Sequence, residues 1–155
     1  MIHRALFLPL LLAACTAGVP TDTQPAAPAA DALAQVGRWK LQGAVDRQGR
    51  PIAVLPGGKA VHALVFANGE LAIEGGCNHM GGRYRLDGSG RLVVSEIHST
   101  LMACMDEELM TADSAVSALL QGPSEWTIAE SYPEQLSLQH TDGRRSHCVA
   151  VRPAP

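Results

Sequence analysis

The chain has few aromatic residues and no basic cluster. Phe, Trp and Tyr make up 4% of its 155 residues, so the core of a folded domain must consist mainly of aliphatic side chains. Twelve Lys and Arg stand against 15 Asp and Glu, for a net charge of -3. Because nucleic-acid-binding domains carry clustered Lys and Arg, we expect no nucleic-acid partner.

Common catalytic motifs are also missing from the sequence. It contains no Gly-x-Ser-x-Gly, no His-Glu-x-x-His and no complete phosphate-binding loop. The adjacent carboxylates Glu107 and Glu108 would point apart on a helix, so they would not act as a pair. We therefore expect a protein that is not an enzyme and needs no cofactor.

The N-terminal residues have the pattern of an export signal. Arg4 supplies a positive charge, and the apolar run over residues 5–14 is shorter than the ~20 residues that a membrane-spanning helix needs. The run ends in Leu12-Ala13-Ala14-Cys15, which resembles the lipobox of bacterial lipoproteins. This resemblance implies cleavage before Cys15 and lipidation of that cysteine, which would anchor the mature chain in a membrane. An ordinary cleaved signal is the alternative.

Composition divides the chain into three segments. Residues 1–14 form the expected lipoprotein signal peptide. Residues 15–35 are rich in Pro, Ala and Thr, so we expect the lipidated cysteine followed by a disordered tether. Residues 36–155 are long enough for one domain. Thr16 after the cysteine favours the outer membrane, so we expect a lipid-anchored protein of the cell envelope that faces the periplasm.

Turn signals about every ten residues separate short β-prone runs in the domain, which favours an antiparallel β fold. Asn68-Gly69 between two apolar runs predicts a hairpin, because both turn positions need positive φ. Apolar residues at helical spacing predict a helix over 106–121, with Asp106 as its cap and Gly122-Pro123 at its end. We predict an α+β fold: a curled, barrel-like antiparallel sheet of seven to eight short strands, with the helix inserted before the last three.

Three aromatic residues, Trp39, Phe66 and Trp126, are expected in the core. The cysteines leave the pairing open: if Cys15 carries lipid, the remaining three allow three pairings in an oxidising compartment. The expected strands are residues 39–45, 61–66, 71–74, 83–86, 91–97, 126–130, 136–140 and 148–152.

Three short motifs carry a family resemblance. Gly75-Gly76-Cys77-Asn78, Gly82-Arg83-Tyr84 and Thr100-Leu101-Met102-Ala103-Cys104, followed by a helix, resemble the META domain of HslJ-like bacterial lipoproteins. The resemblance runs from about Trp39 to Val151. It implies a compact, β-barrel-like α+β domain from a family associated with heat shock, novobiocin resistance and envelope integrity, with no established catalytic mechanism. The motif residues are Gly76, Asn78, Gly82, Tyr84, Thr100, Met102 and Ala103.

The resemblance also implies a disulfide between Cys77 and Cys104, since both belong to the motif. Cys148 is then a small buried residue, a reactive thiol or a half of an intermolecular bridge. Asn78 and Thr100 would hydrogen-bond the turns around the disulfide, or else form a small polar ligand-binding patch. The sequence departs from the family pattern at Leu101, where Arg is usual, and an acidic helix residue, commonly Glu, is Asp113.

We therefore expect a non-catalytic envelope lipoprotein that supports stress or antibiotic tolerance and envelope integrity by binding or scaffolding. Its partner would be an unknown envelope protein or a small ligand. The alternative is a periplasmic soft-metal protein for copper or zinc, because thiolate, thioether and imidazole groups suit such ions. Its ligands would be Cys77, His79, Met80, Met102 and Cys104, although their spacing matches no known metal motif.

Overall fold

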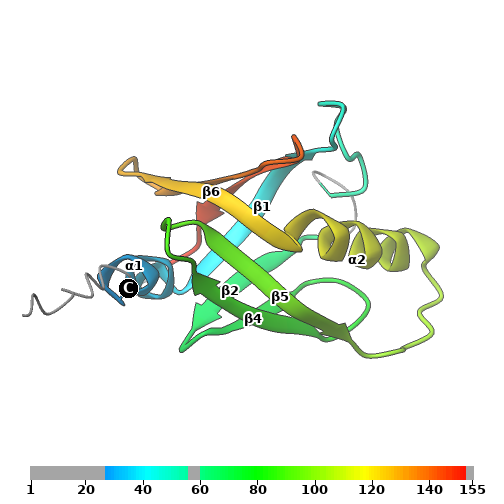
Figure 1. The fold of residues 1–155 in the computed structure, drawn as a ribbon. Coiled ribbons are helices and arrows are strands. Elements are labelled where there is room, and N and C mark those ends of the chain that lie inside the picture. Colours follow the sequence, from blue (N-terminus) through cyan, green and yellow to red (C-terminus); the bar gives the residue numbers. More distant parts are fainter. Residues whose placement is uncertain (1–26, 56–59, 153–155) are drawn as a thin grey trace, which may run out of the picture.

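The computed structural model describes residues 27–55 and 60–152, whose eight strands close into an antiparallel barrel (Figure 1). Each strand pairs with the next along the chain, and the eighth pairs with the first. The predicted fold class is confirmed, with eight strands and a helix before the last three. The strands are β1 (Arg38–Val45), β2 (Ala63–Ala67), β3 (Glu70–Glu74), β4 (Met80–Leu86), β5 (Leu92–Ser99), β6 (Gly122–Ala129), β7 (Gln135–His140) and β8 (Arg145–Ala150).

Alternation of polar and apolar residues directs one face of each strand into the barrel. In β7, Leu136, Leu138 and His140 are buried, whereas the residues between them are exposed. The hairpin predicted at Asn68-Gly69 is present, with φ of 51° and 80° at the two turn positions. The core is aliphatic for the most part, as the scarcity of aromatic residues requires.

Two of the three aromatic residues predicted for the core are there. Trp39 and Phe66 are fully buried, whereas Trp126 lies at the margin of the core, against which it packs. Trp126 is only half-buried, because its indole Nε1 donates a hydrogen bond to the main-chain oxygen of Gly90 in an exposed turn. Tyr84 takes a place in the core instead, with its ring edge-on to Phe66 at a centroid distance of 5.0 Å.

A helix that the composition did not predict, α1 (Ala27–Val36), precedes the barrel. Leu33 is fully buried, and the indole Nε1 of Trp39 donates to its main-chain oxygen at 3.0 Å. The disordered tether expected over 15–35 is therefore wrong for residues 27–35, since Leu33 gives this segment an apolar anchor. Residues 15–26, including Cys15, and the signal at 1–14 lie outside the described residues. Within the described part of the chain, no helix combines the length and apolar character needed to cross a membrane.

The second helix, α2 (Glu107–Leu120), lies at the opposite end of the barrel from α1 (Figure 1). Asp106 caps it as predicted, accepting a hydrogen bond from the Glu108 N–H at 3.0 Å. Gly122, with φ of 99°, ends it, and β6 begins at that same residue. At the helix C-terminus, Arg144 donates to the main-chain oxygens of Leu119 and Gln121 and so caps the unpaired carbonyls.

Candidate functional site

Cys77 and Cys104 form a disulfide, as the family resemblance implied. It joins the connection between β3 and β4 to the segment that leads into α2, across 27 positions of the sequence. Cys148 is the free cysteine of the described residues and lies buried in β8. Burial raises the pKa of its thiol to about 12, which makes it a packing residue and not a reactive group.

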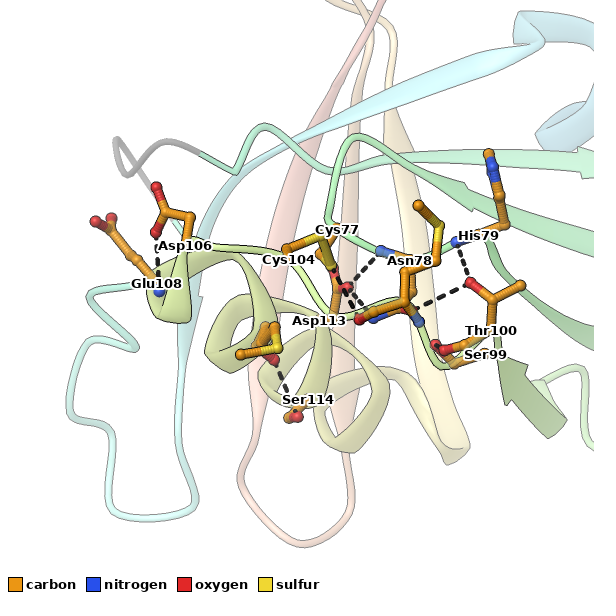
Figure 2. The surroundings of a disulfide bond; sticks show 12 residues. Cys77, Asn78, His79, Ser99, Thr100, Cys104, Asp106, Glu108, Asp113 and Ser114 are labelled. Atoms are coloured by element: carbon orange, nitrogen blue, oxygen red, sulfur yellow. Dashed lines mark hydrogen bonds between the residues drawn. A yellow bond between two sulfur atoms is a disulfide. The ribbon is translucent and has the colours of Figure 1, made fainter.

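Asn78, next to the disulfide, organises the turns around it (Figure 2). Its side-chain oxygen accepts hydrogen bonds from the Met102 N–H at 2.8 Å and from the Thr100 hydroxyl at 3.1 Å. Thr100 Oγ1 in turn accepts from the His79 N–H at 3.1 Å. These bonds fix the segment from Thr100 to Met102 against the start of β4, which is the structural role considered for Asn78 and Thr100.

The same asparagine also contacts helix α2, through Asp113. The main-chain N–H and the side-chain amide of Asn78 donate to Asp113 Oδ2 at 2.8 and 3.1 Å. His62 Nε2 lies 3.0 Å from Asp113 Oδ1, so this nitrogen carries the proton that the carboxylate accepts. We call Asn78, Asp113 and His62 the polar latch. It buries a carboxylate that is satisfied by three donors, which is the condition for burying such a group at tolerable cost.

Gly76 is a glycine because the polar latch leaves no room for a side chain. A Cβ at this position would lie 1.7 Å from Asp113 Oδ1 and 2.8 Å from His62 Nε2. Each residue of the Gly-Cys-Asn motif thus has its own structural role. Gly76 allows the close approach of Asp113, Cys77 forms the disulfide, and Asn78 hydrogen-bonds the turns.

The remaining motif residues separate into two groups. Gly82 and Tyr84 lie in β4 and serve the fold: a Cβ on Gly82 would come within 2.9 Å of the Ser95 main-chain oxygen, and Tyr84 packs in the core. Met102 and Ala103 belong instead to the segment held by Asn78, beside the disulfide.

Two residues of the polar latch, His62 and Asp113, lie outside the three short sequence motifs. His62 is fully buried and contacts Asp113, which lies 51 positions away in the sequence. Asp113 is also buried, and here a signal existed. It lies on the apolar stripe of α2, four residues after Leu109 and three before Val116, where a carboxylate requires a partner.

Beside the polar latch, an apolar loop is exposed to solvent. Leu101 and Met105 are fully exposed and Met102 is half-exposed. Next to this loop, a hollow of about 470 Å³ lies between α2 and the ends of β4 and β5. A concave site with apolar walls and a few polar groups is the usual form of a binding site. The hollow's walls include Met80, Ile97, Met102, Met110, Ser114 and Ser117.

The soft-metal alternative loses two of its five ligands in this structure. Cys77 and Cys104 are bonded to each other, so neither sulfur is a thiolate. Of the others, Met80 is buried whereas His79 and Met102 are exposed. In the ranges that the structure describes, no group of three or more His, Cys, Asp and Glu is arranged to hold a metal ion.

These features define a small closed barrel of eight antiparallel strands with a disulfide-tied helix at one end. Residues 31–152 match the META domain family, so the chain belongs to that family. The structure is similar to the NMR structure of a protein from Burkholderia xenovorans, with a TM-score of 0.64 and 22% identity, over 91% of this chain and 100% of the other. A second NMR structure gives a TM-score of 0.51 and 20% identity, over 78% of this chain and 94% of the other. No curated protein matches.

Proposed function

We propose that this protein is a non-catalytic binding domain of the bacterial cell envelope, held to the outer membrane by lipid on Cys15 and related to the HslJ-like lipoproteins. It supports stress or antibiotic tolerance by binding an envelope protein. The observation that carries this proposal is the exposed apolar loop of Leu101, Met102 and Met105. Solvent-exposed large apolar side chains that cluster in one short segment are typical of interaction sites.

The loop is also held in place, which favours recognition. The Cys77–Cys104 disulfide and the hydrogen bond from the Met102 N–H to Asn78 fix its backbone on both sides of Ala103. A loop that is ordered before binding loses less conformational entropy when a partner docks. A flexible loop with the same side chains would bind more weakly.

The position of the loop agrees with an N-terminal anchor. The chain enters the domain through α1, and α2 with the segment before it lies at the opposite end of the barrel (Figure 1). A domain tethered through the residues before α1 would direct Leu101 and Met105 away from the membrane. The partner would then be a protein in the periplasm or at the cell wall, which would meet the end of the barrel that lies farthest from the membrane.

The test is complementation of a deletion strain with chosen variants, measured as survival under heat and under novobiocin. We expect the double variant Leu101→Ser and Met105→Ser to lose tolerance although its melting temperature is unchanged, because both side chains are exposed. Cys15→Ser should move the protein out of the membrane fraction. Tyr132→Ser is the matched control, since Tyr132 is equally exposed but follows the far end of β6. Full survival with the double variant would refute binding through the loop.

A further inference from the structure

Only the first part of strand β5 has a neighbouring strand on both of its edges. On one edge it pairs with β4 from Leu92 to Ser95 and again at His98 and Ser99, with a β-bulge at Glu96 and Ile97 between the two parts. On the other edge it pairs with β6 through three residues, from Leu92 to Val94. Over the described residues, no strand pairs with the 95–99 segment on that second edge, because the chain there forms α2 before β6 begins. The barrel is closed, but this edge of β5 has no strand beside it over residues 95–99, and α2 follows β5 along the chain there.

The register shows which main-chain groups face this opening. The Thr100 N–H donates to the His79 oxygen at 3.0 Å, so these two residues form a hydrogen-bonded pair at the end of the ladder. Hydrogen-bonded and non-hydrogen-bonded pairs alternate between antiparallel strands. The adjacent pair, Met80 and Ser99, is therefore non-hydrogen-bonded, and Ser99 directs its N–H and C=O away from β4. Ser99 is also exposed, as expected for a residue at an edge that no strand covers.

The hollow described above lies along this edge. One of its sides is formed by Ile97, Ser99 and Thr100, and the other by Met110, Ser114 and Ser117 of α2. Figure 2 shows Ser99 and Thr100 beside Asn78, and Ser114 on helix α2. An open strand edge opposite a helix, with an apolar hollow between them, suits an added strand. The edge supplies main-chain hydrogen bonds and the hollow receives alternate side chains.

Charge selects the kind of segment that fits. No Lys or Arg lines the hollow. Glu107 is exposed one turn before Met110 on the same stripe of α2, and Glu96 is exposed in the bulge of β5; neither is among the residues that line the hollow. A second copy of this chain would bring Glu96 and Glu107 against the same acidic groups, which is unfavourable. A segment with basic and apolar residues in alternation would meet opposite charge.

We propose that the groove between β5 and α2 binds an extended peptide segment of a partner protein, with alternating apolar and basic residues, as a strand added to the 95–99 edge. This inference rests on the proposed function in taking the domain to be a binding module, and it names the chemistry of the partner. The apolar side chains would enter the hollow beside Met80 and Met110. The basic side chains would lie on the side of Glu96 and Glu107.

The test uses the oxidised mature protein in detergent and a blocked, fluorescent nonapeptide of alternating Val and Lys. The same peptide with Glu in place of Lys is the control for charge. We expect the Lys peptide to bind and to slow hydrogen exchange over residues 95–99, and the Glu peptide to bind at least about tenfold more weakly. Ser99→Pro removes the N–H that faces the groove but leaves the ladder with β4 intact, so it should weaken binding about tenfold. Ser99→Ala keeps that N–H and should change the affinity by less than about twofold.

A second variant covers the case in which Ser99→Pro does not fold. Ser117→Phe should fill the hollow from the helix side and weaken binding about tenfold, with the melting temperature retained. The proposal is overturned if no peptide binds the folded protein, or if Ser99→Pro and Ser117→Phe both bind normally. Concentration-dependent dimerisation that is lost in Ser99→Pro would assign the edge to a second copy and overturn it too. If the peptide fails to bind while the Leu101 and Met105 double variant still fails in cells, only the strand-addition step is wrong.

Discussion

The side-chain amide of Asn78 donates to the carboxylate of Asp113 at 3.1 Å, across 35 positions of the sequence and directly beside the Cys77–Cys104 disulfide. The connection between β3 and β4 is thus tied twice to the α2 region. The covalent tie reaches the loop before the helix, and the polar latch reaches the helix itself. The two ties therefore hold the connection between β3 and β4 to different parts of the α2 region.

Removing the Asp113 carboxylate should lower the stability of the folded domain. In Asp113→Ala, the His62 Nε2–H and both Asn78 donors lose their acceptor in a buried site. We expect a loss of about 3 kcal/mol or more in the free energy of unfolding, because each buried donor left without an acceptor costs about 1–3 kcal/mol. Ser114→Ala is the control at the neighbouring exposed position, with an expected change below about 0.5 kcal/mol. Guanidinium denaturation of both variants measures the difference, and equal stability would show that the latch contributes nothing.

Gly76→Ala should disturb the same carboxylate from the other side. Its Cβ would meet Asp113 Oδ1 at 1.7 Å, a distance that forces the helix or the loop to move. We expect a loss of about 1–3 kcal/mol or more from this overpacking. Gly88→Ala introduces the same methyl group where nothing lies within 4 Å, and it should be neutral within about 0.5 kcal/mol. Thermal melts of the two variants separate local crowding from a general effect of replacing glycine.

Either disulfide cysteine should contribute equally to stability. Cys77→Ser and Cys104→Ser remove the same cross-link, which encloses 27 positions, and each should lower the free energy of unfolding by about 3–4 kcal/mol in the chain-entropy model. The melting temperatures of both variants should then match that of the reduced native chain. A much larger loss in one variant than in the other would mean that its cysteine has a further role.

The short antiparallel strands, the hairpin at Asn68-Gly69 and the capped helix after Asp106 followed from local signals, because turn chemistry and periodicity act over a few residues. The polar latch did not, because it joins three segments that the barrel alone brings together. His62 and Asp113 are 51 positions apart, so no pattern within a few residues of either one predicts their contact. Helix α1 was not predicted for a related reason. Leu33, which anchors it, contacts Trp39 only in the folded domain, where the Trp39 indole donates to its main-chain oxygen.

The open edge of β5 could not be predicted either. Residues 91–97 were expected to form a strand, but sequence does not say where a neighbouring strand stops pairing. That point is set by α2, which occupies the space where β6 would otherwise continue beside Ser95 to Ser99. The groove between β5 and α2 therefore depends on the arrangement of the whole barrel. The glycines and cysteines beside it, in contrast, could be recognised in the sequence as a motif.

The thiol of Cys148 should be unreactive in the folded protein. Burial raises its pKa to about 12, so almost no thiolate exists at pH 8, and the sulfur is closed off from solvent. Iodoacetamide should leave the native oxidised domain unlabelled and add one group after unfolding in guanidinium without reductant. Mass spectrometry counts the groups. Rapid labelling of the native protein would mean that β8 opens easily or that Cys148 is more accessible than its position in the barrel implies.

His140 should make the folded protein more stable at neutral than at mildly acidic pH. Burial lowers the pKa of His140 below its ordinary value of 6.5, and the positive charge of Arg144 acts in the same direction. Arg144 is held there by the end of α2, so this charge does not move away. A histidine with a depressed pKa in the folded state binds protons more readily when unfolded.

The resulting stability is present above the unfolded pKa and is lost as the pH falls from about 6.5 through the lower pKa of the folded state. His140→Gln keeps a polar side chain of similar size but does not titrate, so it should show a flatter dependence in this window. Guanidinium denaturation of the native protein and of the variant, at intervals between pH 7.5 and pH 5, gives the two slopes, and groups common to both proteins cancel in their difference. Identical slopes would mean that His140 titrates in the barrel as it does in water, and that neither burial nor Arg144 acts on it.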